Sequence, residues 1–199
     1  MSQIEDQTKP VLARLIVGTT GHLTREARTI LSTWATKTVM VAEHLLPNDD
    51  GIQQSERTAL MSTFQPPDNW FVWIAGYEGK KWRDLGIGQV RIYLDPELVS
   101  KPSEARYHAQ ATTFGLGNVL FCAINTTSPD AVRYYSGRED SALVSGLLQI
   151  WPGCHRTILW PPVNILGDEQ ADNVSNIFKH STFLDPRSDP GADWSFQLP

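Results

Sequence analysis

The segment Lys80-Lys81-Trp82-Arg83 is the basic cluster of this sequence. Three cations around an indole have the chemistry to hold a phosphate backbone and to stack on an exposed base. The segment falls in the connection between the first two predicted strands, so the sequence predicts a basic hairpin that contacts nucleic acid. The alternative is a solvated hairpin whose charges protect the edge of a sheet, and the acidic balance of the chain favours that alternative.

Four polar side chains form a second candidate group on a predicted helix. They are Glu26, Thr33, Lys37 and His44, spaced by seven, four and seven residues. At about 100° per residue this spacing places them in one stripe beside the apolar face, where they could line the rim of a cleft. Lys37 shares its side of the helix with Ile30 and Val41, so partial burial would require an acidic partner. The favoured alternative is the solvated edge of an amphipathic helix, with the lysine stem along apolar surface.

Two His-x-Thr motifs, His22-x-Thr24 and His155-x-Thr157, make up an enzymatic alternative. Pairs of this motif are found in phosphoesterases, which place them on facing strands, and two imidazoles close to one phosphate can exchange protons with it. Thr24 is better explained as a helix N-cap, and a two-residue motif recurs easily by chance. The distance between the two histidines decides this hypothesis.

The two cysteines have neither the spacing of a metal site nor that of a redox pair. Cys154 and His155 are neighbours, and neighbours on an extended chain point to opposite sides, so they cannot form a nucleophile pair alone. Cys122 lies within the apolar segment VLFCAI and is interpreted as a small buried hydrophobe. We therefore expect no metal and no cofactor, with no bound zinc and no DNA cleavage by the purified chain.

The tryptophans fall into two groups. Trp34, Trp70 and Trp73 lie on apolar faces and are predicted to be core residues. Trp151 and Trp160, each followed by proline, could line a groove, although structural packing is the favoured interpretation.

The first 67 residues have a helical period that could position these groups. The clearest helix runs from Thr24 to about Leu46, with Thr24 as its N-cap and Pro47 ending it. Shorter helices are predicted from about Gln3 to Val17, with Pro10 interrupting the hydrogen bonding, and from about Ser55 to Phe64.

Residues 68–160 are predicted to form short strands separated by Gly, Pro and Asp. These strands are Asn69–Tyr77, Gly88–Leu94, Tyr107–Phe114 and Asn118–Asn125. The first is apolar on both faces, which indicates a central strand covered on each side. The last two flank a tight turn at Gly115-Leu116-Gly117 and indicate an antiparallel meander. Leu143–Trp151 fits either a strand or a helix, and Asp168–His180 is typical of a polar helix.

The bulk properties limit the class of protein. A chain of 199 residues can bury a core without disulfides. The N-terminal segment MSQIEDQTKP has no signal-peptide pattern, and no segment approaches the roughly 20 apolar residues of a membrane span, so we expect a cytoplasmic protein without a membrane contact. The net charge of −5 leaves only a local basic patch as a route to nucleic acid.

Together these patterns predict an α+β fold, with N-terminal helices packed on an antiparallel sheet of about four or five strands and a C-terminal helix. The predicted single domain covers residues 1–184, of which 1–67 are mostly helical, 68–160 mostly strands and 161–184 loop and helix. Residues 185–199, rich in Pro, Asp and Gly, are predicted to be an irregular tail.

Several segments of the chain resemble the C-terminal region of bacterial HNH-endonuclease-like proteins. They are MSQIEDQTKPVLARLIVG, LSTWATKTVMVAEHL, NWFVWIAGY, IWPG and WPPVNIL, with Trp34, Lys37, Trp151, Trp160 and Pro161 as the shared signature. In such proteins a Cys-x-x-Cys-Asn element, an earlier Cys pair and a His-containing strand would form the nuclease core. This sequence begins after that core, so no catalytic role carries over. We expect Met1 to be a late start, with the nuclease motif encoded in frame upstream.

The resemblance implies a noncatalytic module associated with, or truncated from, an HNH-type nuclease, with nucleic acid or a nuclease domain as its partner. The basic hairpin would supply the contact with nucleic acid. A standalone phosphoesterase that uses the two His-x-Thr motifs and a protein-interaction domain are the alternatives.

Overall fold

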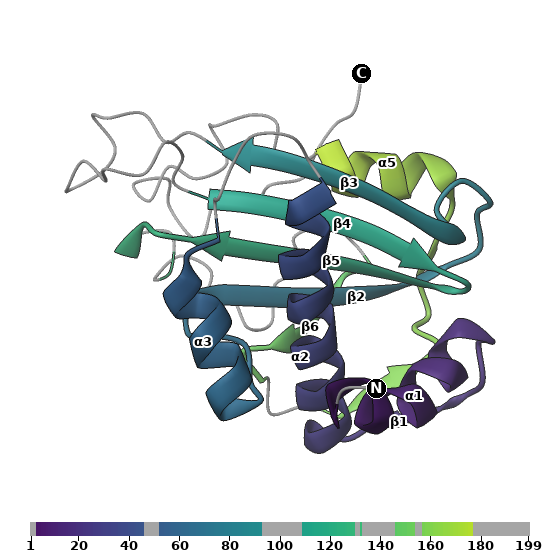
Figure 1. The fold of residues 1–199 in the computed structure, drawn as a ribbon. Coiled ribbons are helices and arrows are strands. Elements are labelled where there is room, and N and C mark those ends of the chain that lie inside the picture. The colour runs from purple at the N-terminus through teal and green to yellow at the C-terminus, as the bar shows by residue number, and fades with distance from the viewer. Residues whose placement is uncertain are drawn as a thin grey trace.

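The computed structural model describes residues 3–45, 52–92, 109–129, 132, 146–153 and 157–176. Its helices are α1 (Gln3–Ile16), α2 (Arg25–Ala42), the 3-10 helix η1 (Glu43–Leu45), α3 (Gln54–Thr63) and α5 (Asp168–Asn176). Its strands are β1 (Gly21–Leu23), β2 (Trp70–Tyr77), β3 (Asp84–Ile92), β4 (Ala109–Leu116), β5 (Val119–Thr126), β6 (Leu148–Trp151), β7 (Ile158–Trp160) and β8 (Ile165–Leu166). The predicted α+β class is confirmed (Figure 1).

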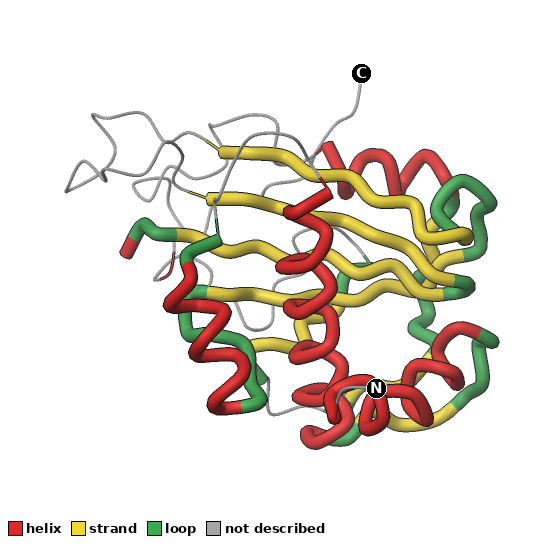
Figure 2. Tube along the Cα trace, viewed as in Figure 1, coloured by secondary structure: helices red, strands yellow, loops and turns green. Residues whose placement is uncertain are grey.

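Helix α2 is the longest described helix, and it lies across the strands of the sheet (Figure 2). The Thr24 hydroxyl accepts a hydrogen bond from the Ala27 N–H at 3.2 Å, which confirms the predicted N-cap. Leu31, Ala35 and Val39 of this helix are buried together in the core, as their spacing of four residues on one helix face requires.

The two shorter helices pack beside α2. Helix α1 continues through Pro10, and the Thr8 hydroxyl donates to the Ile4 carbonyl in its first half. Helix α3 begins with a reciprocal contact in which Glu56 accepts a hydrogen bond from the Gln53 N–H at 2.8 Å. It ends at Phe64, whose φ of 54° places it in the left-handed region.

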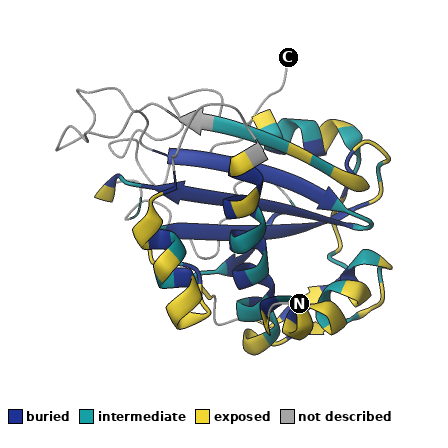
Figure 3. Ribbon diagram, in the orientation of Figure 1, coloured by how far each residue is buried: buried dark blue, intermediate teal, exposed yellow. Residues whose placement is uncertain are grey.

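The main sheet has the strand order β3-β4-β5-β2-β6, and β8 pairs in parallel with β2. Strand β2 lies between β5 and β6, and all eight of its residues are buried, so the predicted central strand is confirmed (Figure 3). The predicted meander is confirmed for β3, β4 and β5, which pair antiparallel in succession. The segment Leu143–Trp151 fitted either a strand or a helix, and its last four residues form the strand β6.

The two faces of the sheet carry separate apolar layers. Trp70, Val72 and Phe121 point to the side covered by α2, and Phe71 and Trp73 point to the side covered by α5. This alternation follows from the two-residue period of a strand.

The predicted C-terminal helix is confirmed from Asp168 to Asn176. Its predicted continuation to His180 and the predicted tail lie outside the described residues.

Strand β3 is irregular at its start. Its register against β4 shifts between Asp84 and Ile87, and Leu85 has a φ of 59° within this bulge. Leu85 and Ile87 are both exposed.

A separate two-stranded ribbon, β1 with β7, lies beside α1 and α2. Its register sets His22 opposite Leu159 and Leu23 opposite Ile158. Leu23 and Ile158 are buried and His22 and Leu159 are exposed, so the ribbon has one core face and one solvent face.

Candidate nucleic-acid interface

The basic segment lies in the loop between β2 and β3, at one end of the main sheet (Figure 1). The prediction that this loop is a hairpin is wrong, because β4 and β5 lie between the two strands that it joins. The loop instead runs past the β4–β5 turn, where the Gly117 N–H donates to the Arg83 carbonyl at 2.9 Å and the Arg83 guanidinium donates to Asn118 Oδ1 at 2.8 Å. The basic segment is thus fixed against the end of the sheet.

Trp82 is buried within this loop, with only 6% of its surface exposed. A Cβ at Gly88 would lie 3.0 Å from its ring, and a Cβ at Gly115 would lie 2.6 Å from its Cβ, so both positions leave room for it only as glycine. Its indole Nε1–H donates to Asp172 Oδ1 at 3.0 Å. The predicted stacking of Trp82 on a base would require this buried ring to leave its position against α5.

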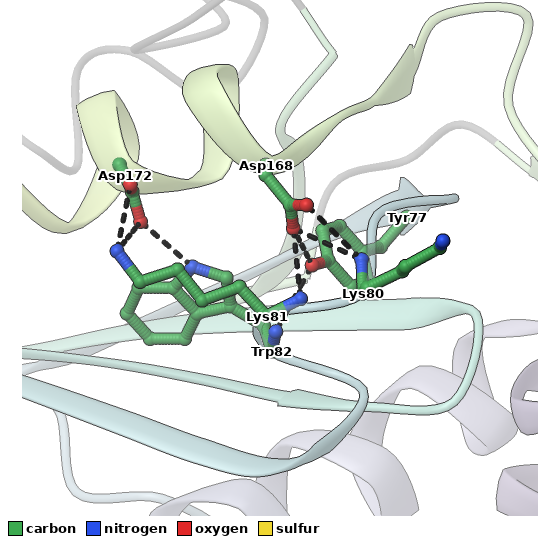
Figure 4. Close-up of polar contacts among 6 residues, drawn as sticks. All are labelled: Tyr77, Lys80, Lys81, Trp82, Asp168 and Asp172. Carbon is green, nitrogen blue, oxygen red and sulfur yellow. Dashed lines mark hydrogen bonds and ion pairs between the residues drawn. The ribbon is translucent and has the colours of Figure 1, made fainter.

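Asp168, the first residue of α5, holds the backbone of the loop (Figure 4). Its carboxylate accepts hydrogen bonds from the Lys80 N–H at 3.0 Å and from the Lys81 N–H at 2.9 Å. It also accepts one from the Tyr77 hydroxyl, which in turn accepts from the Trp82 N–H at 3.0 Å. One carboxylate thereby connects β2, the loop and α5.

Asp172 lies one helical turn after Asp168 and neutralises the middle cation of the cluster (Figure 4). The Lys81 ammonium lies 2.8 Å from Asp172 Oδ2, and the lysine side chain is 62% exposed. An ion pair this exposed contributes little to stability, so the burial of Trp82 is the larger part of the contact with α5.

The hydrogen bonds of this cluster shift the pKa values of Tyr77, Asp168 and Asp172. The Tyr77 hydroxyl, followed by the loop N–H groups, lowers the pKa of Asp168. The bond from Lys81 lowers the pKa of Asp172. Burial, followed by the hydrogen bond to Asp168, raises the pKa of Tyr77. The cluster is therefore built around two ionised carboxylates and a neutral phenol at neutral pH.

Acid should weaken the attachment of α5. Because both carboxylates have a lower pKa in the folded than in the unfolded protein, their stabilising effect is present above the usual carboxyl pKa of 3.8 and is lost as the pH falls through the folded values. We expect D168N/D172N to melt at a lower temperature than wild type at pH 7, and the difference to shrink at about pH 3. Thermal melts at both pH values measure this. An equal difference at the two values would contradict it.

The polar stripe on α2 does not form the rim of one cleft. Thr33 is buried, and its hydroxyl donates to the Phe64 carbonyl at 2.9 Å, which ties α2 to the end of α3. Lys37 pairs with Glu5 of α1, so the acidic partner expected for it is present. Glu26 and His44 are exposed near opposite ends of the helix. Two of the four side chains, Thr33 and Lys37, thus join α2 to neighbouring helices, and the other two are exposed.

The threonines of the two His-x-Thr motifs follow and precede the paired strands of the β1–β7 ribbon. Continued by one residue, the register of the β1–β7 ribbon sets Thr24 opposite Thr157. His22 is exposed and contributes to a cavity of about 140 Å³ beside Arg14. His155 lies outside the described residues, so the phosphoesterase hypothesis stays a prediction.

The remaining predicted residues have packing roles. Trp160 is 1% exposed in the core, which confirms the packing interpretation, and Trp151 packs at the edge of the same core. Cys122 is fully buried, and burial raises the pKa of its thiol to about 12, as expected of a structural cysteine. Cys154 lies outside the described residues.

Tyr77, Asp168 and Asp172 were not singled out by the sequence. The two aspartates are four residues apart in a predicted helix, which places them on one face. That spacing is the only local signal, because the loop they contact lies about 90 residues earlier.

No helix among the described residues is both long enough and apolar enough to cross a membrane. The same part of the chain contains no group of three or more His, Cys, Asp and Glu side chains placed to hold a metal ion. Comparison with protein-family models, curated proteins and solved structures found no match for this chain.

Proposed function

We propose that this chain is a noncatalytic module that acts beside an HNH-type nuclease and contacts the phosphate backbone of nucleic acid through Lys80 and Arg83. The geometry of the β2–β3 loop carries the proposal. Lys80 and Arg83 are exposed, and the Lys80 amine extends away from the two aspartates (Figure 4). Phosphate contacts of this kind position a protein on nucleic acid without reading its sequence.

The rigidity of the loop supports this role. The Arg83 carbonyl is held by the β4–β5 turn, and the buried Trp82 side chain fixes the residue that lies between the two lysines and Arg83. Two cations on a backbone held in this way lose less conformational entropy on binding than two cations on a free segment. The loop thus presents Lys80 and Arg83 as a fixed pair.

The noncatalytic part of the proposal is supported by what the other candidate side chains do. Thr33 joins α2 to α3, Lys37 joins α2 to α1, and Trp160 fills the core. Each of these polar or aromatic groups stabilises the fold through a contact with a neighbouring element. Binding, rather than chemistry, is the function that the exposed pair of cations serves.

The double variant K80A/R83A tests the interface. We expect it to bind duplex DNA more weakly than wild type and to reduce the slope of log affinity against log salt by about 1.8, since each lost phosphate contact in a duplex changes that slope by about 0.9. Fluorescence anisotropy with a labelled duplex from 20 to about 200 mM salt measures both quantities.

K9A/R25A is the matched control, because it removes the same charge from exposed positions on α1 and α2. It should retain the wild-type slope. The proposal fails if wild type shows no binding at the lowest salt, or if both double variants lose affinity equally.

A further inference from the structure

The β2–β3 loop has the features of an anion site. Two successive backbone N–H groups, from Lys80 and Lys81, point at one position, and the Tyr77 hydroxyl points at it as well. Successive N–H groups that converge in a turn form a concavity that holds phosphate and other oxyanions. Gly79 borders this position. A Cβ there would be 2.7 Å from the Tyr77 ring, so glycine leaves the space that an anion needs to approach the backbone.

The occupant of this position is a carboxylate of the same chain. Asp168 fills it, and Asp172 takes the ammonium of Lys81. The charges of the two segments are largely opposite, because α5 contains Asp168, Glu169 and Asp172 without a lysine or arginine, and the loop of residues 78–83 contains Lys80, Lys81 and Arg83 with one acid, Glu78. The carboxylates of Asp168 and Asp172 therefore occupy the positions that the phosphate groups of a bound nucleic acid would take.

We infer that α5 is an internal competitor for the anionic partner, with Asp168 in the place of a phosphate oxygen and Asp172 masking Lys81. This inference rests on the proposed contact with nucleic acid and adds its regulation. In the closed state only Lys80 and Arg83 are available, and in the open state the loop N–H groups and Lys81 join them. Nucleic acid binds tightly when the two aspartates give way.

The contacts of Asp168 and Asp172 with the loop are suited to displacement. Asp168 is the first residue of the helix, and the Lys81–Asp172 pair is exposed to water, where such pairs are weak. A polyanion that supplies several phosphates can compete with contacts of this size.

The variant D168N/D172N separates competition from simple stabilisation. Asparagine keeps an acceptor oxygen and the side-chain volume but removes both negative charges. We expect D168N/D172N to bind a labelled duplex at least about fivefold more tightly than wild type at low salt, the lower end of coupling between two sites. A purely structural role predicts equal or weaker binding.

D6N/E26Q controls for net charge, because it removes two exposed acids from α1 and α2. The inference is overturned if D168N/D172N gains no more affinity than D6N/E26Q while K80A/R83A still loses affinity. If neither wild type nor D168N/D172N binds at the lowest salt, the proposed function itself fails. Should the double variant not fold, D172N compared with D6N gives the same decision, with a larger gain expected for D172N.

Discussion

Replacing Trp82 by alanine is expected to lower the free energy of unfolding by about 3–5 kcal/mol, the usual cost of removing a buried large aromatic side chain. The indole is 6% exposed and is packed between the loop, two glycines of the sheet and α5. The loss includes the hydrogen bond from Nε1 to Asp172, which leaves the helix without one of its contacts to the loop. Urea denaturation followed by far-UV circular dichroism measures the change.

W82F is the control that separates packing from the hydrogen bond. Phenylalanine fills most of the space but has no N–H, so we expect a loss of only about 1–2 kcal/mol. The result that would restore a base-stacking role is a W82A variant with wild-type stability and weakened binding of nucleic acid. A destabilised W82A variant supports burial as the function of this ring.

The second large effect is expected at Glu56. This buried carboxylate accepts hydrogen bonds from Trp70 Nε1 at 2.8 Å, from Asn69 Nδ2 at 2.7 Å and from the Gln53 N–H at 2.8 Å. E56A would leave the buried indole N–H without its acceptor and would remove the capping contact of α3. At about 1–3 kcal/mol for each buried donor left unsatisfied, we expect a loss of about 3 kcal/mol or more.

E26A provides the comparison, since Glu26 is exposed at the start of α2 and its loss should change stability by no more than about 0.5 kcal/mol. E56Q should fall between the two, because one amide oxygen remains as an acceptor while the amide nitrogen faces donors. Equal denaturation midpoints for E56A and E26A would show that these hydrogen bonds are replaced by water at no cost.

The elements that the sequence predicted well are those in which one short-range pattern decides the structure. Helix α2 has an apolar period and a capping threonine, which located its start, whereas its predicted end near Leu46 is replaced by a stop at Ala42 followed by η1. Strand β2 is apolar on both faces, which is compatible only with a covered central position. In both cases the local pattern and the global position agree.

The pairing of the strands depends on information that no local pattern contains. Consecutive strands are usually neighbours, so β2 and β3 were expected to form a hairpin. A strand that is buried on both faces needs a partner on each edge, and β5 and β6 occupy those places. Strand β3 is therefore displaced to the far side of β4, so the expected hairpin loop is instead a connection that crosses the ends of β5 and β4.

Trp82 shows the same limit for a single side chain. Two lysines before it and an arginine after it favour exposure, because charged neighbours keep a segment in water. Its burial depends on Gly88 and Gly115 leaving space and on α5 arriving from 90 residues later in the chain. The residues that bury Trp82 are therefore present in the sequence, but no local pattern predicts that they come together in the fold.

The bulge at the start of β3 has a consequence for self-association. Among the described strands, β3 is at the edge of the main sheet, and an edge with regular, unpaired backbone groups can recruit a strand from another molecule. The register shift between Asp84 and Ile87, with Leu85 in the left-handed region, twists the exposed apolar part of the edge out of regular alignment. The protein can thereby leave Leu85 and Ile87 in water without offering a template for edge-to-edge aggregation.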